Sequence, residues 1–274
     1  MSTTTCSTTT QPLFASNKSR EYPLKLQQLI HQLQKTPYLT PAQTQEAVEQ
    51  AYLSTADLMP WASFNHPVSD SYGRKLVFYG GHFEIMVMSW LPGDFSAIHD
   101  HGQTQWGAVQ CFGSAEHFVY QLERDRLSSP IPAPYTPKMV RAVDHSLIHQ
   151  MGNSSDQPFL SLHVYGCADA SNSITGNARI FDLFENSIQH TDGGVFFDLP
   201  EAQINHRRYG LSAATDTIFM HHCLMRDRLQ RILEDRASTI QLTPSQIHRS
   251  QQKLTALQAE ILRLKPSALC KAWN

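Results

Sequence analysis

The chain of 274 residues carries 22 Lys and Arg against 24 Asp and Glu, and this balance argues against a nucleic-acid-binding surface. Its 41% hydrophobic content is enough to bury a full core, so one domain with helical additions is expected. We find no signal-peptide layout and no apolar run approaching the roughly 18 residues of a membrane span, so no membrane segment is expected. The five cysteines form no CxxC pair, and their odd number favours a reducing cytoplasm over a disulfide framework.

The N-terminal part predicts a tail followed by two helices. Residues 1–19 are mostly Ser- and Thr-rich low-complexity sequence and are expected to be disordered. From Tyr22 to Lys35, leucine and isoleucine recur at helical spacing, and Thr40 followed by Pro41 is typical of a helix start. Each helix needs an apolar partner surface, which the following sheet can supply.

From Arg74 onwards the sequence predicts strands. Gly80 and Gly81 separate two strand-like segments that should form a β-hairpin. Further strands are expected within 106–112, 115–123, 139–151 and 159–165, and edge strands at 178–189 and 194–200. No helical pattern of about 10–15 residues separates the strands as a βαβ arrangement would require, which indicates an antiparallel sandwich or barrel.

The last part of the chain returns to helical spacing. One helix is expected around residues 218–232, and a second opens at Thr243 with Pro244 at the next position. Apolar residues spaced 3, 4 and 3 apart, ending at Leu264, resemble a short coiled-coil seam. Because the seam spans few heptads, we expect these helices to pack on the barrel or on each other, with self-association as the alternative.

Three histidines are the strongest candidates for a chemical site. In an extended strand His99 and His101 share one face, and Asp100 lies on the other. Two imidazoles on one face suit neighbouring positions on a metal. An isolated His-x-His motif, however, is more often solvated or structural. His149 supplies a third imidazole further along the chain. The whole pattern, Gly93-x5-His99-x-His101, then Gly113, then His149-x3-Asn153, resembles the signature of the cupin superfamily, a small β-barrel with a metal held by inward histidines.

Two further groups depend on whether they face water or a barrel interior. Ser161, His163 and Tyr165 share one face of a strand, where they are either solvated or form a hydrogen-bond relay inside the barrel. Arg74 is either a surface residue or, inside the barrel, a fork for a substrate carboxylate. Tyr72 faces the same way as Arg74.

Together these residues resemble the cysteine dioxygenase family, thiol dioxygenases of the cupin superfamily, over roughly residues 20–190. The resemblance rests on Tyr72-Gly73-Arg74, Trp90, the HDH motif at 99–101, His149 and the segment from Ser161 to Tyr165. It implies Fe(2+) bound by His99, His101 and His149, a carboxylate bound by Arg74 with Tyr72 and Trp90 nearby, and a relay of Ser161, His163 and Tyr165. It also implies a mainly β, cupin-type antiparallel β-barrel of jelly-roll type, with its N-terminal helices, over residues 20–200. The resemblance does not clearly extend to residues 201–274, which are expected to form a helical extension.

One departure from the family concerns the seventh residue after the first ligand histidine. Animal-type members carry there a cysteine that is cross-linked to the relay tyrosine, and many bacterial members carry glycine. Here the count gives Trp106, and a shift of one residue gives Gly107, so Tyr165 is expected to be an ordinary phenol. If Trp106 faces inward, its indole joins the substrate pocket and narrows it.

The activity implied by the resemblance is oxidation of L-cysteine by O2 to cysteine sulfinic acid. One alternative is a dioxygenase for another small thiol carboxylate such as 3-mercaptopropionate, although members specialised for that substrate carry glutamine in place of the arginine. Another is a non-catalytic cupin that binds a ligand or serves in assembly. The ligands alone do not identify the metal, because three histidines and water also describe catalytic zinc.

Overall fold

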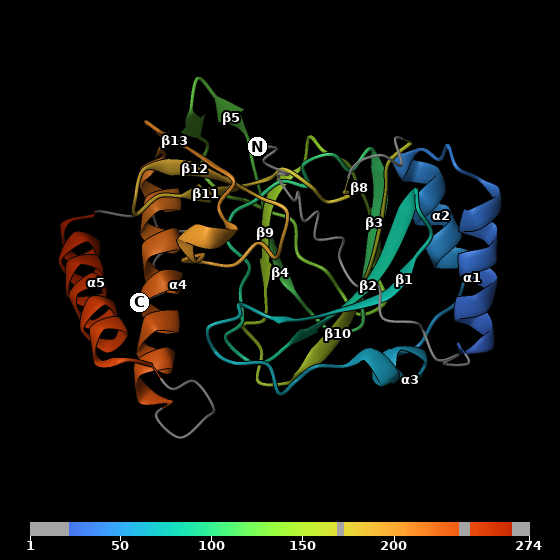
Figure 1. Ribbon diagram of the computed structural model, residues 1–274, viewed down its shortest axis with the longest axis horizontal. Helices are drawn as coiled ribbons and strands as arrows, with labels where there is room; N and C mark the ends of the chain where they lie inside the picture. The colour runs from blue at the N-terminus through green and yellow to red at the C-terminus, as the bar shows by residue number, and fades with distance from the viewer. Residues whose placement is uncertain (1–21, 169–172, 236–241, 265–274) are drawn as a thin grey trace, which may run out of the picture.

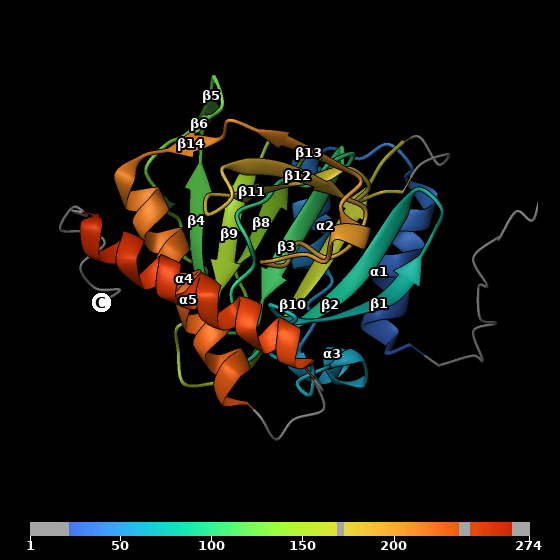
Figure 2. The same ribbon diagram turned by 60° about the vertical axis from the view of Figure 1, so that its left-hand side comes forward.

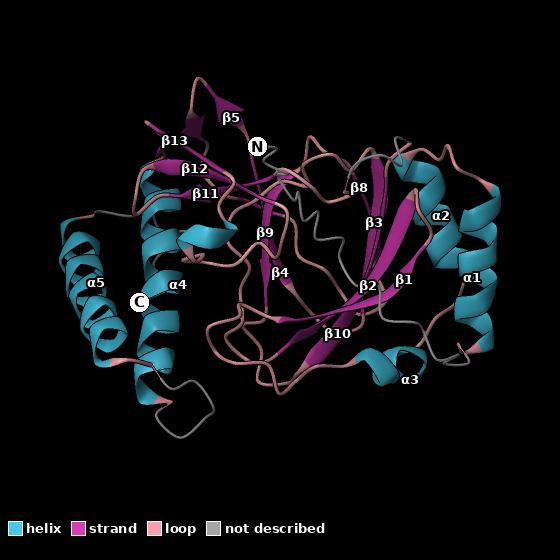
Figure 3. Ribbon diagram, in the orientation of Figure 1, coloured by secondary structure: helices cyan, strands magenta, loops and turns pink. Residues whose placement is uncertain are grey.

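The computed structural model describes residues 22–168, 173–235 and 242–264, so the tail expected at 1–19 lies outside the described residues. Strands occupy the centre of the molecule and helices flank them on two sides (Figures 1 and 3). The helices are α1 (Leu24–Lys35), α2 (Pro41–Gln50), α3 (Thr55–Leu58), α4 (Thr215–Glu234) and α5 (Pro244–Arg263). Short 3-10 helices cover Met59–Trp61 and Glu201–Gln203.

The strands follow the turns expected from the sequence. They are β1 (Gly73–Tyr79), β2 (Phe83–Trp90), β3 (Trp106–Cys111), β4 (Glu116–Tyr120), β5 (Leu122–Glu123), β6 (Arg126–Leu127), β7 (Ile131–Pro132), β8 (Val140–Val143), β9 (Ile148–Gly152), β10 (Phe159–Gly166), β11 (Ala178–Asp182), β12 (Ser187–Thr191), β13 (His206–Tyr209) and β14 (Ser212–Ala213). The hairpin around Gly80 and Gly81 is confirmed, because β1 and β2 pair in antiparallel fashion.

Two walls enclose the core. One is a five-stranded sheet in the order β1-β2-β10-β3-β8, whose neighbours are all antiparallel. The other contains β7-β4-β9 and β11-β12-β13, which are joined through Phe95 and His99 by bridges to Gly152, His149 and Ile180. Side chains of both walls share one buried cluster. The expected mainly β, antiparallel fold with helices before and after it is confirmed.

Alternation along the strands separates an outer from an inner face. On β10, Leu160, Leu162 and Val164 are buried with α1 and α2 on the outside of the five-stranded sheet. Ser161 and His163 are also buried but point the other way, into the barrel. The polar face of this strand is therefore internal.

Helix α4 belongs to the same core as the barrel. Leu224, Met225 and Leu229 join the cluster that both walls share, and α5 adds Leu257 to it. Figure 2 shows α5 lying across α4 on the side away from α1. The strands also continue past residue 200, since β13 pairs with β12 and β14 with β6. Self-association through α4 and α5 stays a prediction.

The prediction of an edge strand at 194–200 is wrong. The Val195 N–H donates to the Tyr72 hydroxyl (3.4 Å) and the Phe197 N–H to the Ser71 hydroxyl (3.2 Å), instead of to a neighbouring strand. Asp198 has φ of 58°, which extended strands do not adopt. Within the described ranges, no helix combines the length and the apolar character needed to cross a membrane.

Candidate metal centre and substrate pocket

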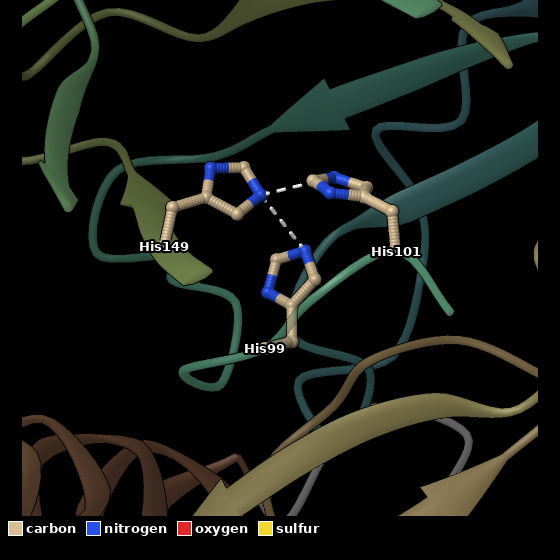
Figure 4. Close-up of side chains that lie close together, drawn as sticks. All are labelled: His99, His101 and His149. Atoms are coloured by element: carbon tan, nitrogen blue, oxygen red, sulfur yellow. Dashed lines mark hydrogen bonds between the residues drawn. The ribbon is translucent and has the colours of Figure 1, made fainter. Parts of the chain in front are cut away.

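Three buried histidines converge inside the barrel (Figure 4). The Nε2 atom of His149 lies 3.1 Å from Nε2 of His99 and 3.2 Å from Nε2 of His101. The backbone aligns two of the rings, because His99 and His149 exchange N–H···O bonds of 2.9 Å in both directions. Gly102 ends this segment with φ of +53°, and a Cβ there would lie 2.2 Å from the Gly176 carbonyl oxygen. The turn after the His-Asp-His motif therefore needs glycine.

The hydrogen bonds assign the ring protons of two of these histidines. A carbonyl oxygen only accepts, so His99 donates its Nδ1–H to Ala97 (2.9 Å). In the same way His117 donates its Nδ1–H to Ala133 (2.9 Å), and its Nε2 accepts from Nδ1–H of His149 (2.8 Å). Neutral His99 and His149 thus turn bare Nε2 lone pairs towards each other.

This arrangement fits a metal ion. Two lone pairs at 3.1 Å repel each other unless a cation lies between them. Nitrogens about 2.1 Å from one ion are separated by roughly 3.0–3.4 Å, which matches the observed spacing. Burial lowers the pKa of His99 to about 4 and the pKa values of His101 and His149 well below the ordinary range. All three imidazoles are neutral at pH 7 and can bind a metal without first losing a proton.

A chain of hydrogen bonds leads from Trp90 to a phenol beside the histidines. The Trp90 indole donates to Ser161 Oγ (2.8 Å), Ser161 Oγ lies 2.7 Å from His163 Nε2, and His163 Nδ1 lies 2.8 Å from the Tyr165 hydroxyl. Because Trp90 can only donate, the arrangement that uses every group runs from the Ser161 O–H to Nε2 and from the Nδ1–H to Tyr165. The Tyr165 O–H is then free to donate into the cavity. The ring centroid of Tyr165 lies 5.2 Å from the ring centroid of His101.

Arg74 and Tyr72 line the same cavity as the histidines. The ring centroid of Tyr72 lies 4.7 Å from that of Trp90, and burial raises the pKa of Tyr72 to about 12, so the phenol stays protonated. Within the described part of the chain, Arg74 donates no side-chain hydrogen bond and forms no ion pair with a carboxylate. Burial raises the pKa of Glu84, and the charge of Arg74 acts on this carboxyl in the opposite direction without an ion pair between the two. Arg74 is therefore available to an anionic ligand.

The family follows from a comparison of the sequence. The family described as cysteine dioxygenase type I matches residues 13–169, which is more than half of the chain. The chain belongs to this family. The match ends before α4 and α5, so both C-terminal helices lie outside the region that resembles the cysteine dioxygenase type I family.

Several solved structures show a partial likeness to this cysteine dioxygenase family member. A protein of Klebsiella pneumoniae with a double-stranded β-helix domain is 18% identical, with a TM-score of 0.32. The matched region covers 41% of this chain and 89% of the Klebsiella chain. The protein TT1209 of Thermus thermophilus is 19% identical, with coverages of 40% and 93% and a TM-score of 0.32. A sugar phosphate isomerase of the cupin superfamily from Silicibacter pomeroyi is 16% identical, with coverages of 60% and 88% and a TM-score of 0.35.

Trp106 does not contribute to the substrate pocket, contrary to the sequence-based expectation. Its indole packs on the outer side of the five-stranded sheet with the residues that α1 and α2 cover. Gly107 lies opposite Tyr165 in the register of β3 and β10, and a Cβ there would lie 3.1 Å from Tyr165 Cδ1. Gly107 therefore stands where the cross-linking cysteine of animal-type cysteine dioxygenases is expected, and the pocket has no indole from Trp106 to narrow it.

His117 is a residue of the site that the sequence did not reveal. It lies on β4, 3% exposed, and its ring joins the backbone of residue 133 to His149. A metal-binding imidazole commonly donates its second N–H to such an outer partner. A single histidine in a short alternating strand carries no signal of this role, because most such residues only fill the core.

Proposed function

We propose that this protein is an Fe(II)-dependent thiol dioxygenase that converts L-cysteine and O2 to cysteine sulfinic acid. One observation carries the proposal: three neutral imidazoles share a cavity with the guanidinium of Arg74, which has no ion pair among the described residues, and with a phenol held by a relay. Membership of the cysteine dioxygenase type I family supports the same chemistry. The free thiols of Cys111 and Cys167 support a cytoplasmic location.

The metal would be held by His99, His101 and His149. When bound, iron supplies the redox chemistry towards dioxygen and lowers the pKa of a coordinated thiol, so that sulfur is oxidised as the thiolate. Soft thiolate and imidazole donors also suit other divalent metals, and metal content therefore has to be measured.

The residues of the chain bind and orient the substrate. Arg74 receives the carboxylate through two parallel N–H bonds, and the protonated hydroxyl of Tyr72 lies in the same wall. Tyr165 donates its O–H towards the reacting groups, and the His163–Ser161 pair resupplies the proton. The rest of the lining of this cavity, of about 40 Å³, combines methionine, tryptophan and valine side chains with the polar Ser96, Asp100 and Thr175.

The test is anaerobic loading with Fe(II), followed by measurement of O2 uptake and product mass with cysteine. Stoichiometric iron and a product heavier by two oxygen atoms are expected. A panel that includes 3-mercaptopropionate separates the cysteine enzyme from one specialised for another thiol carboxylate. Protein that binds no iron and yields no sulfinate with any thiol would identify a non-catalytic binding module instead.

Variants separate the roles of the site residues. His99→Ala, His101→Ala and His149→Ala should each lose metal, whereas Tyr165→Phe should keep metal and lose rate. Arg74→Ala should chiefly raise KM, by the equivalent of about 1.5–3 kcal/mol for one charge-assisted contact. Retention of metal by all three histidine variants would show that the ligands are different residues.

A further inference from the structure

A second cavity, of about 460 Å³, lies on the other side of His149 from the metal centre. It opens where the two walls of the barrel do not pair, between β8 at the edge of one sheet and β4 with its neighbour β7 in the other. His117 forms part of its wall, and the same ring accepts the Nδ1–H of His149. A molecule in this side cavity would therefore contact the residue that orients a metal ligand.

Arg141 is the charged side chain of the side cavity. Arg141 lies opposite Val109 in the register of β8 and β3, and Val109 belongs to the barrel core. The Arg141 side chain therefore projects from the inner face of the sheet. Its guanidinium donates one bond to the Pro134 carbonyl (3.1 Å) and lies 5.2 Å from the centroid of the Tyr135 ring. These two contacts hold the planar group in place.

Among the described residues, the Arg141 guanidinium forms no ion pair, and its buried Nε has no hydrogen-bond acceptor. No aspartate or glutamate is among the residues that line the cavity. The guanidinium is only partly buried, and a carboxylate from solution can meet it through two parallel bonds.

The rest of the wall fits a small organic molecule better than a hydrated inorganic ion. Val119, Met139 and Leu147 give apolar surface next to the guanidinium, and Gln45 of α2 closes one side. The Gln45 side chain is fixed there, because its Oε1 accepts the Ala142 N–H (3.2 Å). We propose that the side cavity is a second binding site, which takes a small organic carboxylate independently of the thiol site.

Backbone amide NMR of zinc-loaded protein tests this proposal, because Zn(II) does not broaden the signals. Titration with malonate should shift the amides of Val119 and Ala142 in a saturable manner, whereas uncharged malonamide should not. Arg141→Met should weaken the malonate response by about tenfold or more, the loss of one charge-assisted contact, and Arg141→Lys should fall between. Signals outside the cavity report that each variant keeps its fold.

Two controls keep this site separate from the thiol site. Arg74→Met removes the carboxylate partner in the thiol pocket and should leave the response at Val119 and Ala142 unchanged. Arg126→Met removes an exposed arginine and should have no effect. The proposal is overturned if about 10 mM malonate, a concentration that detects even weak binding, causes no saturable shift at Val119 and Ala142. It is equally overturned if the shift survives in Arg141→Met or appears with malonamide.

Discussion

His149 is oriented by a hydrogen bond that begins at a backbone carbonyl. The Ala133 oxygen fixes the proton on His117, and His117 in turn fixes the proton on the outer nitrogen of His149. Partners of this kind commonly contribute a factor of about 10–100 in metal affinity. We therefore predict that His117→Ala weakens metal binding by about that factor, as measured by competition with a chelator.

The control for His117→Ala is His145→Ala, which removes an exposed imidazole and should leave affinity unchanged. Equal affinity in both variants would mean that the backbone pairing of His149 with His99 is sufficient to orient the ring.

Gly107 is tightly enclosed on its inner side. A Cβ at this position would lie 2.5 Å from the Val164 carbonyl oxygen, which belongs to the central strand β10 and cannot easily move. We predict that Gly107→Ala lowers the free energy of unfolding by about 1–3 kcal/mol, the usual cost of overpacking. Denaturant unfolding measures it. Gly193→Ala, whose nearest atom is the Thr191 hydroxyl at 3.5 Å, should be nearly neutral.

The sequence predicted the cluster of three histidines correctly but misplaced the residue beside Gly107. His99, His101 and His149 were predicted because their pattern resembles a known signature, and the structure brings them together. Trp106 was misplaced because counting from His99 left two adjacent residues, Trp106 and Gly107, as candidates for the pocket. Neighbouring residues of a strand point to opposite faces, and the structure places the indole in the outer core. Counting along a loop cannot decide which of the two faces inward.

At the scale of elements, helix α4 holds the turn between β2 and the metal-binding segment. Arg231 donates to the carbonyl oxygens of Pro92 (3.2 Å) and Gly93 (2.8 Å) and lies 3.3 Å from the Asp94 carboxylate. Asp94 is 1% exposed and also lies 3.0 Å from His66 Nε2. This turn directly follows Trp90, whose indole begins the relay.

Removal of this contact should loosen the turn without removing the metal. We predict that Arg231→Met lowers the free energy of unfolding by about 1–2 kcal/mol, because Asp94 keeps His66 as a partner and Arg231 is partly exposed. Turnover should fall while metal content stays constant. Arg226→Met is the matched control, since the ion pair of Arg226 within the described residues is with its neighbour Asp227. Equal turnover in the two variants would contradict a role for α4 in the site.

Elements that depend on residues close in sequence could be predicted, and elements that depend on distant residues could not. Thr40 and Thr243 cap their helices through the expected side-chain bonds, with the glutamine three residues on completing each capping box. Residues 194–200 look like a strand in sequence, but their N–H groups bond to side chains of the loop before β1. That partner is distant in sequence, and composition therefore cannot indicate it.

At the scale of the whole molecule, the barrel and α4 bury several neutral imidazoles. Loss of hydration lowers the pKa of His99 and of His117 to about 4 and the pKa of His163 to about 3. The pKa of His221 on α4 is also lowered well below its ordinary value by burial. These residues are spread over both walls and a helix, so their protonation acts on the fold as a whole.

These shifts predict a metal-free protein that is sensitive to mild acid. The unfolded chain takes up protons near pH 6.5 and the folded chain only near pH 4, so stability is complete above pH 6.5 and is lost as the pH falls towards 4. Each such histidine contributes up to about 1.4 kcal/mol per pH unit in this window. The pKa of His66 is raised beside Asp94, so this one residue acts in the opposite sense.

Denaturant unfolding of the metal-free protein between pH 7 and pH 5 measures this sum. The free energy of unfolding should fall as the pH is lowered, and His221→Leu should show a shallower fall because one buried imidazole no longer titrates. His145→Leu, at an exposed position, should keep the slope of the unmodified protein. A stability that rises between pH 7 and pH 5 would mean that the buried imidazoles gain water or counter-charges in the folded protein, and would remove the basis for three neutral metal ligands.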